Sequence, residues 1–183
     1  MPITKEPRIL VGISACLLGQ EVRYDGGHKR CRPVTGTLGR IFEWVPVCPE
    51  VELGLGVPRE TLRLEGRAGS PHLVFRDTRD DITDRMTAWS RRRLAQLERL
   101  DLCGFVLKSR SPSCGMSRVK VFRAGASGRP SLRGVGLFAR ALMDRFPLLP
   151  VEEEGRLRGR AARDGFVERV LAYRRRRERR ART

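Results

Sequence analysis

Three cysteines stand just beyond stretches that are rich in aliphatic residues. They are Cys16, Cys48 and Cys114, and the stretches before them span residues 9–14, 44–47 and 104–108. If these stretches are parallel strands, the three thiols meet at one edge of a sheet. Converging thiolates would bind zinc or an iron–sulfur cluster. The alternative is that each cysteine is a small buried residue, which is the commonest state of a free cysteine.

Polar side chains that could handle protons or substrate accompany these thiols. Glu50 lies two residues after the second cysteine, where a carboxylate could transfer protons beside a metal centre; otherwise it is a solvated surface residue. Ser109, Ser111 and Ser113 precede the third cysteine, and their hydroxyl groups could position an anion or a water molecule. The same serines also fit an ordinary turn.

A loop that could bind substrate follows the first cysteine. The segment 22–28 combines Tyr24 and Asp25 with two glycines. We interpret it as a binding loop, with a plain turn as the alternative.

The two remaining cysteines have other predicted roles. Cys103 begins the third apolar stretch, so at about 3.3 Å per residue it lies at the far end of its strand from Cys114, and we predict a structural role. Cys31 lies in the basic loop 28–33, where positive charge favours a thiolate, and it is a reserve ligand. The odd number of cysteines, 5 in all, argues against a disulfide framework and favours reduced thiols in a cytosolic compartment.

Short apolar runs alternate with helical patterns along the chain. The central strands that we predict are Ile9–Ser14, Trp44–Val47, Gly104–Lys108 and Leu148–Glu152, and further short strands are expected at Thr61–Leu64, Leu73–Arg76 and Val119–Phe122. The predicted helices span Asp84–Leu100, with Thr83 as N-cap, and Val135–Phe146, and a third begins near Gly165. This succession predicts an α/β fold: a single domain with a central, mostly parallel sheet flanked by helices, a Rossmann-like three-layer arrangement.

Composition indicates one globular domain that attracts anions. The chain has 183 residues, of which 40% are hydrophobic and 32% charged, and its formal net charge is +17. We predict a domain over residues 1–173 and an Arg-rich tail over 174–183. Such charge favours nucleic acids, nucleotides or polyanions in general. Since the sequence has neither a long apolar run nor a secretory leader pattern, we expect a cytoplasmic protein without membrane contact.

Several motifs in a fixed order resemble one known family. They are Ser14–Gly19 (SACLLG), Val22–Lys29 (VRYDGGHK), Val47–Val51 (VCPEV) and Lys108–Gly115 (KSRSPSCG), and the likeness extends to Leu149–Leu157. With these motifs the chain resembles the DUF523 family, which includes the thiouracil desulfidases.

The resemblance implies a [4Fe-4S] cluster held by Cys16, Cys48 and Cys114, with the fourth iron free for substrate. It implies a hydrolytic, non-redox reaction on a thiolated pyrimidine, either 2-thiouracil or a 4-thiouracil or 4-thiouridine derivative. Oxygen from water replaces the sulfur, which leaves as hydrosulfide. Glu50 and Ser111 match the family's proton-handling pair, and a Lewis-acidic iron beside them suits this chemistry.

Other functions remain open at this point. The substrate could be a thiolated nucleobase, nucleoside, nucleotide or RNA, and the net charge favours those that carry phosphate. The chain could instead be a zinc or iron–sulfur module that binds RNA through its Arg-rich tail, or one that transfers electrons. A desulfidase differs from both because it needs an acid–base pair beside an open metal position.

Overall fold

The computed structural model describes residues 9–123 and 128–181 of the chain. Its strands are β1 (Ile9–Ser14), β2 (Phe42–Val47), β3 (Leu62–Arg67), β4 (Ser70–Phe75), β5 (Phe105–Leu107), β6 (Val119–Phe122), β7 (Ser131–Gly134) and β8 (Val151–Glu153). Its α-helices are α1 (Arg32–Thr35), α2 (Pro49–Glu52), α3 (Thr83–Arg99), α4 (Leu137–Arg145) and α5 (Arg160–Ala181), with 3-10 turns η1 (Ala15–Leu18), η2 (Leu38–Arg40) and η3 (Arg156–Arg158). Residues 1–8, on which the leader prediction rests, residues 124–127 and the last two residues of the Arg-rich tail lie outside the described ranges.

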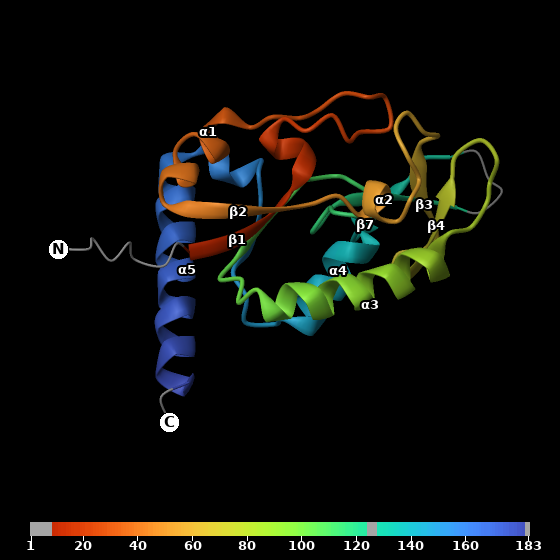
Figure 1. The fold of residues 1–183 in the computed structure, drawn as a ribbon. Helices are drawn as coiled ribbons and strands as arrows, with labels where there is room; N and C mark the ends of the chain where they lie inside the picture. Colours follow the sequence, from red (N-terminus) through yellow and green to blue (C-terminus); the bar gives the residue numbers. More distant parts are fainter. Residues whose placement is uncertain (1–8, 124–127, 182–183) are drawn as a thin grey trace.

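Four strands form a parallel sheet in the order β2-β1-β5-β8. Its strands β1 and β2 lie side by side in Figure 1. All four predicted central strands are present, and β1 has the predicted bounds. The chain moves outward from β1 to β2 and then returns past β1 to β5, so the direction of winding reverses between β1 and β5. At such a point the loops leave the two strands toward opposite faces and open a crevice at their carboxyl ends.

Helices cover both faces of this sheet. On one face Phe42 of β2 packs against Phe166 of α5, with ring centroids 6.1 Å apart. On the other face Phe105 of β5 packs against Phe138 of α4 at 5.9 Å, and Phe138 contacts Trp89 of α3 at 5.6 Å. The two buried clusters confirm the predicted three-layer α/β fold.

Close packing at the centre of the sheet depends on a glycine in β1. A Cβ atom on Gly12 would lie 2.2 Å from the ring of Phe105 on the neighbouring strand. The aromatic ring therefore fills the space that a side chain on β1 would need.

A second four-stranded sheet has the order β4-β3-β6-β7 and mixes parallel and antiparallel pairs. It contains the three further strands expected from the sequence, and β6 has the predicted bounds. The sequence did not predict β7, because its side chains are mostly exposed and lack an apolar alternation. Leu64, Leu73 and Val121 of this sheet join the core beneath α3 and α4.

The helices differ from the sequence prediction at their starts. The N-cap role of Thr83 is wrong: α3 begins at Thr83, whose amide donates to the Asp81 carboxylate at 2.8 Å. Helix α5 begins at Arg160 rather than near Gly165 and continues through the Arg-rich segment to Ala181. Among the described residues, no helix has the length and apolar character needed to cross a bilayer.

Candidate functional site

The carboxyl ends of three adjacent strands bring three cysteines into one cleft. Cys16 lies in η1 directly after β1, Cys48 lies between β2 and α2, and Cys114 lies in the loop after β5. All three line a cleft of about 360 Å³ beside the point where the winding reverses. The structure therefore brings together the thiols that the sequence placed at strand ends.

Basic side chains outnumber acidic ones around this cleft. The basic residues of its lining are Arg23, Lys29, Arg59, Lys108 and Arg110, and the acidic ones are Glu50 and Glu60. A concave surface with this balance attracts anions.

The three thiols are free, and their surroundings favour the protonated form. Burial raises the pKa of Cys16 to about 11 despite the nearby Lys108 ammonium group. Burial and then the Glu50 carboxylate raise the pKa of Cys48 to about 12, and the same two causes raise the pKa of Cys114 well above its ordinary value. Thiolates in this cleft therefore require a bound cation, which a metal centre provides.

Glu50 lies beside one of these thiols. Its Oε2 atom is 3.6 Å from the Sγ atom of Cys48 and 4.0 Å from the guanidinium group of Arg59. Because α2 begins directly after Cys48, its first turn holds the carboxylate and the thiol next to each other. The carboxylate is in position to exchange a proton with a molecule bound in the cleft.

Arg59, which no sequence motif marks, joins two walls of the cleft. Its guanidinium group donates to the carbonyl oxygens of Val22 at 3.0 Å and Gly56 at 2.8 Å, and its backbone amide donates to the carbonyl of Tyr24 at 2.9 Å. The carbonyl of Val22 also lies 3.8 Å from the Sγ atom of Cys48. With its side chain only 8% exposed, Arg59 fixes the loop after β1 against the residues that precede β3.

Ser111 organises the loop that carries the third cysteine. Its Oγ atom accepts hydrogen bonds from the backbone amides of Ser113 at 3.2 Å and Cys114 at 3.0 Å. These bonds use the hydroxyl as an acceptor, so its own proton is left to donate to a group in the cleft.

The start of α4 holds the same loop from behind. The backbone amides of Leu137 and Ala139 donate to carbonyl oxygens of the loop at 3.2 and 3.1 Å. A Cβ atom on Gly136 would lie 2.5 Å from the backbone of Ser113, so only glycine allows this approach. The helix thereby satisfies its own first amides and fixes the loop.

Glu154, which follows β8, anchors the other end of this loop. Its carboxylate accepts hydrogen bonds from the amide and the hydroxyl of Ser109, both at 2.7 Å, and from the Lys108 ammonium group at 2.6 Å. Burial alone would raise the pKa of Glu154, but these hydrogen bonds outweigh it and lower the pKa. The Ser109 hydroxyl, although it lines the cleft, is thus already engaged in the support of the loop.

The structure divides the residues that the sequence suggested for substrate binding. Tyr24 and Ser109 line the cleft. Asp25 is exposed, and its carboxylate accepts a hydrogen bond from the amide of Gly27 at 3.1 Å, which closes the turn of its loop. Ser113 is fully buried. Neither Asp25 nor Ser113 is among the residues that line the cleft, so the structure does not bring these two side chains to it.

The other two cysteines lie away from the cleft. Cys31 and Cys103 are both buried in the core between the parallel sheet and α5. Cys103 stands before β5, at the amino end of the strand, as expected. Cys31 stands directly before α1 and is not part of the cleft lining, so the structure does not bring this reserve ligand to the other thiols.

The donor set of the cleft fits an iron–sulfur cluster. Within residues 9–123 and 128–181, no three histidine, cysteine or acidic side chains are grouped so that they could hold a metal ion. A [4Fe-4S] cluster spans several ångströms and takes each cysteine at a separate iron, so its ligands need no such close grouping. Three free thiols on three different loops are the soft donors that such a cluster uses.

Comparisons with known proteins agree with this geometry. The model of a family described as 2-thiouracil desulfurase matches residues 11–154. A protein of Bacillus subtilis (strain 168), described as "Uncharacterized protein YbbK", is 28% identical over 111 residues, which are 58% of this chain and 73% of that protein. Among solved structures, the "[4Fe-4S]-dependent thiouracil desulfidase TudS (DUF523Vcz)" is similar, with 31% identity and a TM-score of 0.62, over 82% of this chain and 93% of that one.

Proposed function

Because the chain belongs to the 2-thiouracil desulfurase family, we propose that it is a non-redox desulfidase that uses a [4Fe-4S] cluster to remove sulfur from a thiolated pyrimidine. The convergence of three free thiols and a carboxylate in one cleft carries this proposal. The ligands are Cys16, Cys48 and Cys114, and three protein ligands leave one of four irons open.

The proposed reaction exchanges sulfur for oxygen without a change in oxidation state. A thiocarbonyl group and a water molecule give a carbonyl group, hydrosulfide and a proton; one C–S bond breaks and one C–O bond forms. When bound, the cluster supplies a Lewis-acidic iron with affinity for sulfur. The residues of the chain must bind the pyrimidine and move the protons of water.

Glu50 carries out the proton transfer in this proposal. Its carboxylate accepts a proton from the attacking water and returns one to the ring or to the departing sulfur. The neighbouring Arg59 guanidinium group holds the carboxylate in place at 4.0 Å. The Ser111 hydroxyl, whose proton is not used within its loop, donates a hydrogen bond to the substrate or to the water.

The lining of the cleft favours a substrate that carries phosphate. Five basic side chains stand against two acidic ones, which suits a thiolated nucleotide better than a free base. Tyr24, 40% exposed at the cleft, offers an aromatic face on which a pyrimidine ring could stack. Comparing kcat/KM for 4-thiouracil, 4-thiouridine and its 5′-monophosphate tests this preference, and equal values would exclude it.

Anaerobic reconstitution tests the function itself. The chain is loaded with iron and sulfide, and its visible absorbance and its release of hydrosulfide from 2-thiouracil and 4-thiouridine are measured. We expect Cys16→Ser, Cys48→Ser and Cys114→Ser each to lose the activity, whereas Cys103→Ser, a buried cysteine outside the cleft, keeps it. If the cluster is bound but neither substrate releases hydrosulfide, the proposed activity is refuted. If the wild-type chain binds no cluster, the proposal that the three cysteines hold one is refuted.

A further inference from the structure

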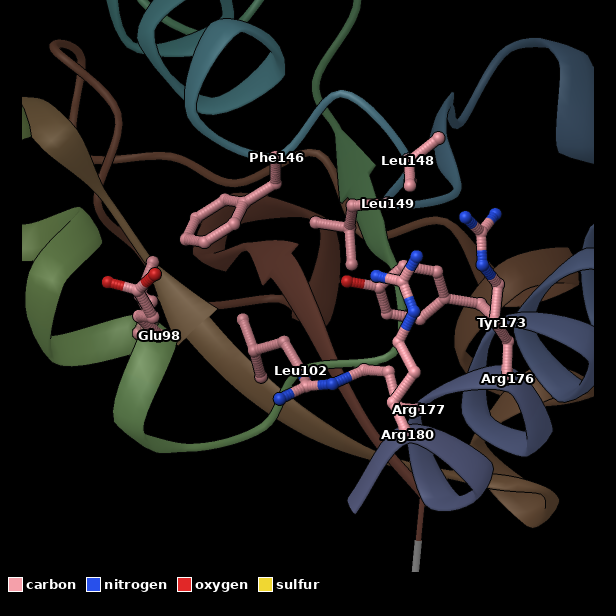
Figure 2. A pocket seen from close by; sticks show the side chains of 10 residues that line it. Glu98, Leu102, Phe146, Leu148, Leu149, Tyr173, Arg176, Arg177 and Arg180 are labelled. Atoms are coloured by element: carbon pink, nitrogen blue, oxygen red, sulfur yellow. The ribbon is translucent and has the colours of Figure 1, made fainter. Parts of the chain in front are cut away.

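A second cavity, of about 400 Å³, lies at the opposite edge of the parallel sheet (Figure 2). Its walls are the end of α3, the segment between α4 and β8, and the last turns of α5. Leu102 and Leu149 of its lining stand shortly before β5 and β8, so the cavity lies at the amino ends of strands whose carboxyl ends face the thiol cleft.

The floor of this cavity is apolar. Leu97, Leu102, Phe146 and Leu149 form it, and Leu148 adds a leucine that is 55% exposed at the rim. A concave apolar surface of a few hundred Å³ is the usual setting for an organic ligand.

The rim of the cavity is basic. Arg176, Arg177 and Arg180 line it from α5 (Figure 2). Arg177 is paired with Asp101, whereas Arg176 and Arg180 have no hydrogen bond or ion pair among the described residues. The one acidic side chain of the described lining is Glu98, which is paired with Arg145 at 2.6 Å.

We propose that this cavity binds an amphipathic organic anion: an apolar chain or ring that ends in a carboxylate or a phosphate. The apolar body would cover the leucines and Phe146, and the anionic head would lie between the guanidinium groups of Arg176 and Arg180. Charge complementarity disfavours a neutral apolar ligand, because it would leave the two guanidinium groups of the rim unpaired.

The apolar floor distinguishes this occupant from a nucleic acid. RNA would pair its phosphates with the same arginines, but its backbone would leave the leucines and Phe146 uncovered. A free inorganic anion would likewise use the rim alone. The combination of floor and rim therefore favours a small ligand with both characters.

Calorimetric titration of the full chain with sodium octanoate tests the proposal. Octyl phosphate compares the two anionic heads, 1-octanol lacks the charge, and inorganic phosphate lacks the apolar body. We expect saturable binding of octanoate or octyl phosphate to one site per chain, with 1-octanol about tenfold weaker or worse because it makes no charge-assisted hydrogen bond. Inorganic phosphate should not bind measurably.

Two double variants distinguish binding in the cavity from general attraction of anions to the positive charge of α5. Arg176→Gln with Arg180→Gln removes the unpaired rim and should weaken octanoate binding about tenfold or more. Arg175→Gln with Arg179→Gln removes the same charge at the same spacing from residues outside the lining and should leave binding unchanged. The proposal would be overturned if both double variants lost octanoate binding equally, or if neither anionic amphiphile bound saturably. It would also be overturned if a short single-stranded RNA bound and the amphiphiles did not.

Discussion

The two edges of the parallel sheet carry cavities of similar size and opposite chemistry. The cleft at the carboxyl edge, about 360 Å³, holds three thiols and a carboxylate, while the cavity at the amino edge, about 400 Å³, holds leucines beneath a rim of arginines. At the carboxyl edge the reactive side chains stand on loops that directly follow strands. At the amino edge the arginines come from one helix, and no thiol lines the cavity.

The edges also differ in how firmly their side chains are held. Arg59 donates hydrogen bonds to the carbonyl oxygens of Gly56 and of Val22, which lines the thiol cleft, and Glu154 accepts from three donors of the loop that leads to the third cysteine. At the other edge, Arg176 and Arg180 are exposed and make no such bonds within the described chain. Fixed groups suit a reaction that needs defined geometry, whereas long free side chains suit a ligand of variable shape.

Replacement of Glu50 should have the largest effect, and it tests whether the carboxyl edge of the sheet is the catalytic one. If Glu50 transfers the proton, Glu50→Gln should lower hydrosulfide release by about 10²- to 10⁴-fold while the cluster absorbance stays. Glu60→Gln is the matched control, because Glu60 lines the same cleft but its carboxylate accepts hydrogen bonds from Thr78. If Glu50→Gln binds a full cluster and keeps near-native turnover, Glu50 does not transfer the proton, and the carboxyl edge loses the catalytic role that sets it apart from the amino edge.

A smaller effect is expected from Arg59, because it acts through other groups. Arg59→Met loses the bonds to Val22 and Gly56 and the charge beside Glu50, so we expect about a tenfold loss in kcat/KM. Arg76→Met, which removes an exposed arginine, is the control. An unchanged kcat/KM in Arg59→Met would mean that Arg59 does not position the groups of the cleft.

The contrast between the edges explains what the sequence could predict. The apolar run Ile9–Ser14, which is buried on both sides, is predicted with its bounds, whereas the bounds of the other three central strands differ from the prediction. The placement of the thiols follows from the positions of the strand ends. Arg59 was missed because its partners are backbone carbonyls, one of them 37 residues away, which no side-chain pattern reveals. The cavity at the amino edge was missed because its lining comes from three separate parts of the chain, the end of α3, the segment between α4 and β8, and the last turns of α5.

Alkaline pH should destabilise the metal-free chain through its thiol cleft. The pKa of Cys16 is raised from 9.0 to about 11 in the fold, so between these values the unfolded chain loses a proton that the folded chain keeps. Stability should therefore fall as the pH rises from 9 toward 11, by up to about 1.4 kcal/mol per pH unit for this thiol. Urea unfolding of the reduced chain at pH 8 and 10 measures it. Cys16→Ala should show a shallower fall, and an equal fall would place the alkaline sensitivity elsewhere.

The smallest effect is expected at Ser113, which lies near the thiol cleft without facing it. Its side chain is fully buried, and its Oγ atom has no hydrogen-bond partner among the described residues, so Ser113→Ala removes a hydroxyl that makes no bond there. Hydrosulfide release should stay within about twofold, and stability should stay equal or rise slightly, because an unpaired polar group leaves the core. Ser111→Ala, by contrast, removes the acceptor of two backbone amides and should lower both activity and unfolding free energy. A large loss of activity in Ser113→Ala with normal stability would indicate that Ser113 contacts the substrate. A residue that only packs against α4 should not lower turnover without also lowering stability.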